Sequence, residues 1–254
     1  MKVIACQLDI VWENRAANHA KVRQLLEQAA PPPGSLVVLP EMFASGFSMQ
    51  AAAISDSRAR ETQGFLADTA QTLGIYLVGG LVTDGSAGLG RNECVGYDPQ
   101  GREFVRYCKL HPFTLGGESA HYEAGEKIAL FEWGGFQVAP FICYDLRFPE
   151  IFRAAVRQGA NLFLVVANWP VARIAHWNAL LKARAIENQA YVVGVNRCGQ
   201  DPQLSYSGQS QVVSFTGEIM ATAGEGEGSC QAELRLTDLS AYRQQLPFLA
   251  DMRS

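Results

Sequence analysis

The chain has 254 residues, of which 48% are hydrophobic and 18% are charged, and its formal net charge is −4. These fractions exclude a disordered, collagen-like or low-complexity chain. With only 21 Lys and Arg residues in a mildly acidic chain, we expect no nucleic-acid-binding surface, which would need a concentrated basic face. A chain of this length can bury roughly three quarters of its unfolded surface, so its core needs no disulfide or metal.

The first third of the chain predicts alternating strands and helices. Strands are expected at 3–9 and 36–40, on either side of a helix at 14–30 whose apolar residues have helical spacing and which stops at three prolines. A helix at 61–73 and a strand at 75–83 follow. This βαβ alternation favours a sheet with crossover helices.

After this point hairpins interrupt the alternation. They are predicted at 92–108, 129–143 and 210–223. The other predicted elements are a loop at 109–127, helices at 149–158 and 173–188, strands at 161–168 and 190–196, and a strand and short helix in the last 25 residues. We find no linker and no fixed-period repeat. We therefore expect one mixed α/β domain over residues 1–254 rather than a (β/α)₈ barrel, which needs eight regular βα units.

Six cysteines are spread widely and irregularly, and none forms a Cys-x-x-Cys pair: Cys6, Cys94, Cys108, Cys143, Cys198 and Cys230. The N-terminal residues lack the apolar core and cleavage site of a signal peptide. Apolar uncharged stretches such as 158–172 are shorter than the roughly 20 residues that cross a bilayer. We therefore expect reduced thiols, a cytoplasmic location and no membrane partner.

Several common motifs are absent. The chain has no phosphate-binding Gly-x-x-x-x-Gly-Lys-Ser/Thr loop and no Gly-x-Gly-x-x-Gly between a strand and a helix, so we expect no nucleotide cofactor. It also lacks the Gly-x-Ser-x-Gly elbow of serine hydrolases. Cys108 and His111 could begin a zinc site, but no second ligand pair follows, so we expect no metal. A papain-like Cys–His pair stays open on spacing alone.

Three reactive side chains lie where predicted strands end. Glu41 follows the strand at 36–40, while Lys109 and Cys143 follow or close strands of the first two hairpins. Singly, each has an ordinary explanation: a solvated carboxylate, a surface lysine and a buried thiol. Jointly they are the general base, the oxyanion-stabilising ammonium and the nucleophile of a cysteine hydrolase that needs no histidine. Backbone N–H groups at a strand-to-helix turn could also lower the pKa of Cys143.

Three motifs resemble the signatures of the nitrilase (carbon–nitrogen hydrolase) superfamily, in that family's order: Leu-Pro-Glu-Met at 39–42, Lys-Leu-His-Pro at 109–112 and Cys-Tyr-Asp-Leu-Arg-Phe-Pro-Glu at 143–150. Further matches at 167–170, 176–188 and 208–219 extend the resemblance over essentially the whole chain. The resemblance implies a catalytic triad of Glu41, Lys109 and Cys143. It also implies a four-layer α-β-β-α sandwich that dimerises through helices, as a homodimer or larger homo-oligomer.

The resemblance implies a fourth catalytic residue, a glutamate in the loop after the lysine. Glu118 matches it best, although Glu123 and Glu126 lie in the same loop and a solvated carboxylate is the alternative. The helix predicted at 173–188 has a strong apolar face. We therefore interpret four of its residues as structural rather than catalytic: His176, Trp177, Arg184 and Glu187.

The motifs are most similar to the omega-amidase branch, whose members release ammonia from 2-oxoglutaramate and related ω-amides. Nitrilases have Cys-Trp-Glu where this chain has Cys-Tyr-Asp, which favours amides over nitriles. Arg147 could bind a substrate carboxylate, because guanidinium groups pair bidentately with carboxylates, or it could form a structural salt bridge. Asn168 is expected to line the pocket, and Tyr144 and Trp169 to wall it.

Two alternatives to this function stay open. The substrate could be an N-carbamoyl amino acid or another aliphatic amide, since both place a carboxylate or a carbonyl near a C–N bond. In a different class of function, the chain could be a catalytically silent binding partner, because a fold alone does not determine activity.

Overall fold

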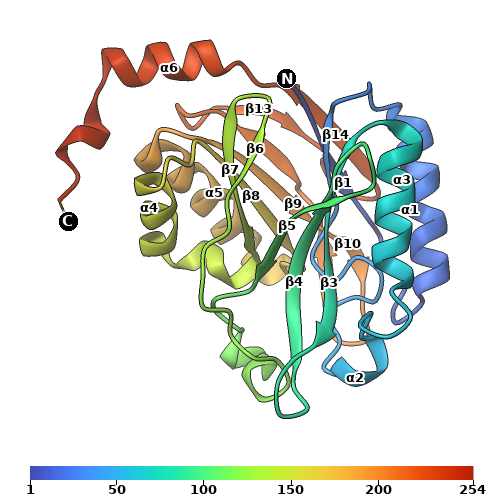
Figure 1. Cartoon of the computed structure of the whole chain (residues 1–254). Helices are drawn as coiled ribbons and strands as arrows, with labels where there is room; N and C mark the ends of the chain where they lie inside the picture. Colours follow the sequence, from blue (N-terminus) through green and yellow to red (C-terminus); the bar gives the residue numbers. More distant parts are fainter. Residues whose placement is uncertain (254) are drawn as a thin grey trace.

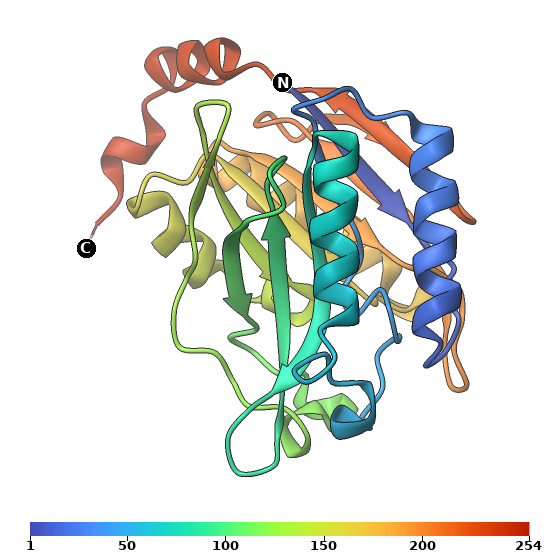
Figure 2. The ribbon, with the colours of Figure 1, turned by 45° about the vertical axis from the view of Figure 1, so that its right-hand side comes forward.

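A computed structural model of the protein describes residues 1–253, which form four layers (Figure 1). Two six-stranded sheets lie face to face, and helices cover the outer face of each. Helices α1 (Arg15–Ala29) and α3 (Glu61–Leu73) cover the first sheet and run side by side over it in Figure 2. Helices α4 (Pro149–Arg157) and α5 (Ile174–Asn188) cover the second. The predicted α-β-β-α sandwich is confirmed.

The first sheet has the strand order β14-β1-β2-β3-β4-β5. Its strands are β1 (Lys2–Gln7), β2 (Leu36–Val38), β3 (Tyr76–Asp84), β4 (Gly90–Tyr97), β5 (Glu103–Cys108) and β14 (Gly228–Glu233). Strands β1, β2 and β3 are parallel, as the βαβ pattern predicted, while β4 and β5 continue the sheet as antiparallel neighbours. The carboxyl ends of β2, β3 and β5 therefore reach the same edge of the sheet.

The second sheet has the order β13-β12-β9-β8-β7-β6. Its strands are β6 (Phe131–Trp133), β7 (Phe136–Ile142), β8 (Leu162–Ala167), β9 (Tyr191–Asn196), β12 (Gln211–Val213) and β13 (Ile219–Thr222). Strands β7, β8 and β9 are parallel, with α4 and α5 as the crossover helices. The two predicted hairpins of this half are β6–β7 and β12–β13.

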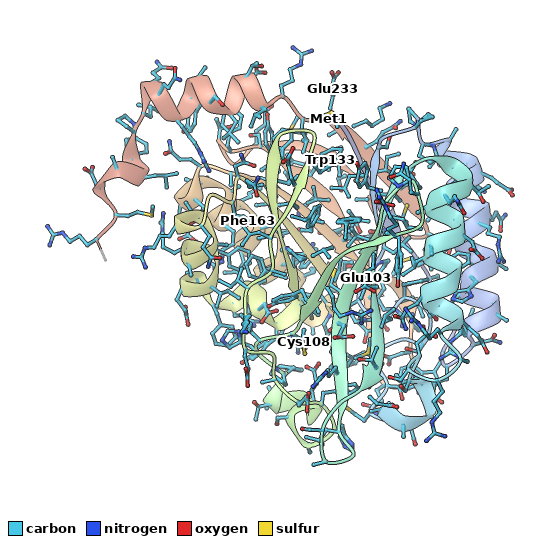
Figure 3. All side chains as sticks on the ribbon, in the orientation of Figure 1. Met1, Glu103, Cys108, Trp133, Phe163 and Glu233 are labelled. Carbon is cyan, nitrogen blue, oxygen red and sulfur yellow. The ribbon has the colours of Figure 1, made fainter. Side chains whose placement is uncertain are left out.

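The alternation of side chains along a strand divides the core into layers. On β1, Val3 and Ala5 belong to the cluster between the two sheets, whereas Ile4 and Cys6 pack with α1 and α3. Strand β8 is apolar at every position because helices and the other sheet cover both of its faces. Figure 3 shows these side chains filling the layers, among them Phe163 of β8.

The helix boundaries follow local sequence signals. The side chain of Asn14 accepts a hydrogen bond from the backbone of Ala17 at the start of α1, which ends at the left-handed Ala30 before the three prolines. Helix α3 ends at Gly74 with φ of 64°, a conformation that glycine adopts without strain. Both predicted helices are confirmed to within a residue or two.

Short elements without periodicity were missed. These are α2 (Ala51–Ile54), the hairpin of β10 (Cys198–Gln200) and β11 (Ser205–Ser207), and 3₁₀ turns within and beyond the predicted loop at 109–127. The turns are η1 (Thr114–Gly116), η2 (Glu118–Ala120), η3 (Cys143–Arg147), η4 (Val171–Arg173) and η5 (Phe248–Asp251). Elements of three to five residues are too short to show a 3.6-residue or two-residue period.

The last strand and the last helix close the structure. Strand β14 pairs with β1 along its full length, and Met1 and Leu234 exchange backbone hydrogen bonds of 2.8 Å. Met1 and Glu233 accordingly lie near each other in Figure 3. Helix α6 (Leu236–Gln245) then projects past the top of the second sheet (Figure 1). Within residues 1–253, no helix combines the length and apolarity needed to cross a membrane.

Candidate active site

The strand ends of the first sheet bring three charged side chains into one buried cluster. Glu41, Lys109 and Glu118 are each 0% exposed. The ammonium Nζ of Lys109 lies 3.0 Å from Glu41 Oε1 and 2.8 Å from Glu118 Oε2, so one cation serves two carboxylates. This pairing raises the pKa of Lys109 above its ordinary value, although burial by itself acts the other way. Lys109 is therefore charged in the folded protein.

Sequence reasoning missed a fourth member of this cluster, Asn92 on β4. Its side-chain amide donates hydrogen bonds of 2.7 Å to Glu41 and 2.8 Å to Glu118. Its backbone carbonyl accepts a hydrogen bond of 2.9 Å from the backbone N–H of Lys109. The predicted hairpin held the signal, because pairing 92–98 with 103–108 places Asn92 beside the strand end that carries Lys109.

Glu41 is fixed from a second side by Asn168, which follows β8. The backbone N–H of Asn168 donates to Glu41 Oε2 at 2.8 Å, and its side-chain amide donates to the backbone carbonyl of Glu41 at 2.7 Å. The loop that carries Glu41 also lies directly on β3, where a Cβ atom at Gly80 would come within 2.5 Å of the Cα of Glu41. A glycine is therefore required at this point for the loop to approach the strand.

Cys143 stands at the first residue after β7, at the start of turn η3. Its φ of 45° is left-handed, which is uncommon for a residue with a side chain and is a mark of functional sites. Within residues 1–253 its sulfur makes a single hydrogen bond, of 3.8 Å, to the carbonyl oxygen of Asn168. The nucleophile candidate is thus presented on a strained turn without a strong hydrogen bond.

The structure corrects the expectation that the turn lowers the pKa of Cys143. Burial raises the pKa of this thiol well above its ordinary value, and the carboxylates of Glu41 and Glu118 add to the effect, while Lys109 opposes it. Cys143 therefore rests as a neutral thiol, and a base has to remove its proton during attack.

Asp145 anchors the turn that carries Cys143. One carboxylate oxygen accepts from Tyr107 Oη at 2.7 Å and from the backbone N–H of Ile142 at 3.0 Å. The other accepts from the backbone N–H of His111 at 3.0 Å and lies 2.9 Å from its Nδ1. Since Tyr107 and His111 flank Lys109 in the chain, Asp145 connects the nucleophile turn to the lysine strand.

A pocket opens above Cys143. Its cavity volume is about 40 Å³, and its lining includes the predicted Tyr144, Arg147, Asn168 and Trp169. The other residues of the lining were not among the predicted site residues: Phe47, Phe113, Pro170, Arg173, Leu204 and Tyr206.

Two arginines of the pocket rest on aromatic rings. The guanidinium of Arg147 lies 4.8 Å from the ring centre of Trp169, and that of Arg173 lies 5.5 Å from the ring centre of Phe113. Arg147 also lies 3.2 Å from Nδ1 of His176. Within residues 1–253 neither arginine pairs with a carboxylate. The pocket wall therefore carries positive charge that the protein itself leaves uncompensated.

The carbon–nitrogen hydrolase family model matches residues 2–244 of this chain. The chain belongs to the carbon–nitrogen hydrolase family. It is 40% identical to the omega-amidase YafV of Yersinia enterocolitica, over 99% of this chain and 96% of that protein. It is 32% identical to the 2-oxoglutaramate amidase of Bacillus subtilis, over 98% and 97%. The crystal structure of XC1258 from Xanthomonas campestris, a CN-hydrolase with an arsenic adduct in its active site, is 34% identical with a TM-score of 0.93, over 100% and 97% of the two chains.

This carbon–nitrogen hydrolase places the three candidate glutamates of its lysine loop in different surroundings. Glu118 is buried on η2 against Lys109 and also accepts a hydrogen bond of 2.5 Å from the backbone N–H of Phe113. Glu123 faces away and pairs with Arg91 and Ser86. Glu126 is exposed. Only Glu118 of the three contacts the charged cluster.

In this carbon–nitrogen hydrolase, residues of α5 that were interpreted as structural contact residues of the pocket wall or of turn η3. Trp177 is fully buried against Trp169, with ring centres 5.7 Å apart. Arg184 donates to the backbone carbonyl of Leu146 at 2.7 Å and pairs with Glu187 at 2.9 Å. His176 alone reaches the pocket rim, through Arg147. In residues 1–253 we find no cluster of three or more metal-ligating side chains.

Proposed function

We propose that the protein is an omega-amidase, which hydrolyses the terminal amide of a small carboxylate such as 2-oxoglutaramate to an acid and ammonia. One observation supports this most strongly: the neutral thiol of Cys143 lines a pocket whose wall carries an unpaired guanidinium, and the buried carboxylate of Glu41 and ammonium of Lys109 lie close enough to act on the pKa of that thiol. The thiol, the carboxylate and the ammonium suit acyl transfer from an amide. The guanidinium of Arg147 suits a substrate carboxylate at the other end.

In the proposed first step, Sγ of Cys143 bonds to the amide carbon while Glu41 takes the thiol proton. The carbonyl electron pair moves onto oxygen, and the backbone N–H of Tyr144 donates to the resulting oxyanion. The ammonium of Lys109 donates hydrogen bonds to Glu41 and Glu118. It therefore stabilises the oxyanion through its positive charge rather than through a hydrogen bond. Base and nucleophile act together because the thiol is not ionised beforehand.

In the second step, Glu41 returns the proton to the nitrogen, the C–N bond breaks and ammonia leaves behind a thioester on Cys143. Glu41 then takes a proton from a water molecule, whose oxygen attacks the thioester carbon. The C–S bond breaks and its electron pair stays on sulfur, Glu41 returns the proton to Sγ of Cys143, and the carboxylic acid leaves. No redox change and no cofactor enter this sequence.

The substrate end of the pocket carries the specificity in this proposal. Arg147 lies over the ring of Trp169, and a guanidinium held beside an aromatic ring can still pair bidentately with a carboxylate. Arg173 adds a second positive charge to the same wall.

We also propose that the chain acts as a single domain, in the cytoplasm, as a homodimer or larger homo-oligomer. The two sheets share one site, which favours a single functional unit. The six cysteines are free, which suits a reducing compartment. Ile186 on α5 and Phe248 on η5 are 53% and 59% exposed, and such apolar side chains favour association through this side of the molecule.

The test is ammonia release from 2-oxoglutaramate, an uncharged aliphatic amide of equal length, an N-carbamoyl amino acid and a nitrile. We expect the highest kcat/KM for 2-oxoglutaramate. In Arg147→Gln, KM for this substrate should rise roughly 10- to 100-fold, because a charge-assisted bidentate pair is lost, while turnover of the uncharged amide should stay within about twofold.

Three results would redirect the proposal. Equal rates on charged and uncharged amides would remove carboxylate recognition. Faster turnover of the N-carbamoyl compound would make that the substrate class. A folded protein that releases no ammonia from any compound would favour the binding-only alternative.

A further inference from the structure

We propose that Asn92 is a positioning residue of the active site, which holds Glu41 and Glu118 ionised side by side so that Glu41 can act as the base. Asn92 is 1% exposed and lies on β4, outside the three motif segments. Its side chain and its backbone together contact all three charged residues of the cluster.

The charges in the cluster show why such a residue is needed. Two buried carboxylates face one ammonium, so the cluster keeps one uncompensated negative charge while both glutamates are ionised. Two carboxylates that bond to the same amide group lie close together. Repulsion between two such negative charges favours protonation of one of them, as in other carboxylate pairs. A protonated Glu41 could not accept the thiol proton of Cys143.

The hydrogen bonds form a closed ring around this charge. Oε1 of Glu41 accepts from Lys109 at 3.0 Å and from Asn92 at 2.7 Å. Oε1 of Glu118 accepts from the same two donors, at 3.1 Å and 2.8 Å. Two donors thus bridge two acceptors. Hydrogen bonds to the charged form of a carboxylate favour that form, so Asn92 supplies neutral donors where a second cation would otherwise be required.

The orientation of the amide agrees with this role. Ionised carboxylates only accept hydrogen bonds, so the amide nitrogen of Asn92 has to face both of them. The amide oxygen is buried and has no hydrogen-bond partner within residues 1–253. The position therefore uses the donor of the amide and leaves the acceptor idle, at a free-energy cost. An aspartate here would place a third negative charge against the other two.

The test compares the pH dependence of kcat/KM in wild type, Asn92→Leu and Asn92→Asp. The leucine is similar in size and has no donor. We expect its kcat/KM at pH 7 to fall roughly 10- to 100-fold, since two hydrogen bonds to charged groups are lost. The acid limb of its profile should move up by at least about one pH unit, because protonation of the carboxylate pair becomes easier. The aspartate variant should be slower still at pH 7.

The matched control is Asn18→Leu. Asn18 is 0% exposed on α1 and bonds only to backbone atoms of Val11 and Ala44. This substitution should lower thermal stability without moving the acid limb. If Asn92→Leu fails to fold, Asn92→Ser carries the same test, because serine keeps one donor and should give a smaller shift in the same direction.

This inference rests on the proposed use of Glu41 as the base but not on the identity of the substrate. A second readout therefore follows alkylation of Cys143 by iodoacetamide against pH, which needs no amide. The same shift in both readouts supports the inference. An unchanged acid limb in a slower variant would show that Asn92 is only structural, and wild-type activity in Asn92→Leu would overturn the inference outright.

Discussion

The two sheets contribute opposite kinds of groups to the site. The first supplies the ionised cluster of Glu41, Lys109 and Glu118, in which every charged atom has at least one short hydrogen bond. The second supplies Cys143, whose sulfur has one long hydrogen bond of 3.8 Å among the described residues and whose backbone is left-handed. The charged groups are held rigidly, and the nucleophile is barely held at all.

This contrast follows from what each group does in the proposed reaction. A carboxylate and an ammonium that stabilise charge work best when they need no reorganisation as charge develops. A sulfur that forms and breaks a covalent bond would lose reactivity to a strong hydrogen bond in the ground state. The hydrogen bonds of Asp145 to both halves of the molecule therefore fix the turn rather than the thiol itself.

The largest expected effect is the loss of activity when Cys143, the residue that the second sheet supplies, is replaced. Cys143→Ala should abolish ammonia release, a loss of at least roughly 10⁴-fold, because no other group can form the thioester. Its melting temperature should stay close to wild type, because the substitution removes only one small atom and one long hydrogen bond. Cys230→Ala, at a buried cysteine on β14, is the control and should keep its activity. Normal turnover in Cys143→Ala would end the thioester mechanism.

The next largest effect is expected when the cation of the charged cluster in the first sheet is removed. Lys109→Met should leave two buried carboxylates without a cation and lower the free energy of unfolding by about 3–5 kcal/mol. Activity should fall at least about 100-fold. Chemical denaturation measures the first quantity. Lys109→Met with Glu118→Gln should recover part of the stability but little activity; if it recovers none, charge imbalance is not the cause.

A smaller effect concerns how closely the Glu41 loop approaches β3. In Gly80→Ala the new Cβ would overlap the backbone of Glu41, which should cost about 3 kcal/mol and displace the base. Gly64→Ala is the matched control. Gly64 lies in α3 with nothing within 4 Å of the new Cβ, so this variant should be slightly more stable. Equal stability of the two variants would contradict the close-approach argument.

The smallest effect is a change of stability with pH, caused by a histidine on helix α1, outside the first sheet. His19 on α1 stacks on Phe65 at 4.2 Å. Burial, with Arg15 and Arg23 nearby, lowers the pKa of His19 from 6.5 to about 4. The unfolded chain therefore binds a proton more readily. Stability should fall by about 2 kcal/mol between pH 7 and pH 5.

The matched variant for this prediction is His19→Phe, which keeps the stacking and cannot titrate. Its free energy of unfolding should not show the same decrease between pH 7 and pH 5. Urea denaturation at the two pH values measures the difference. Identical pH slopes in wild type and variant would assign the acid sensitivity to another group.

The contrast between the sheets also explains what could be predicted from the sequence. Glu41, Lys109 and Cys143 lie at strand ends within compact motifs, so local pattern was enough to find them. Long helices such as α1 and α3 show a clear period and clear ends. The rest depended on contacts between distant segments: Asn92 is 51 residues from Glu41 in the chain and bonds to it, and Arg173 and Tyr206 reach the pocket from the short elements η4 and β11.

The thiol shows the same limit in its electrostatics. A strand-to-helix turn taken alone suggests an acidified cysteine, whereas burial and two carboxylates from the other sheet reverse the direction of the pKa shift. The local sequence indicates which backbone N–H groups surround the thiol. It does not indicate which charged side chains from distant segments lie near the thiol in the fold.

The pairing of β14 with β1 has a consequence for biosynthesis. Residues 228–233 complete the edge of a sheet in which β1 spans residues 2–7, so the ribosome releases this partner of β1 only after β2 to β13. Until then β1 presents an open strand edge, a common template for aggregation. Nascent chains and truncated products that end before β14 are expected to depend on chaperones, although every residue of the active site has already been made.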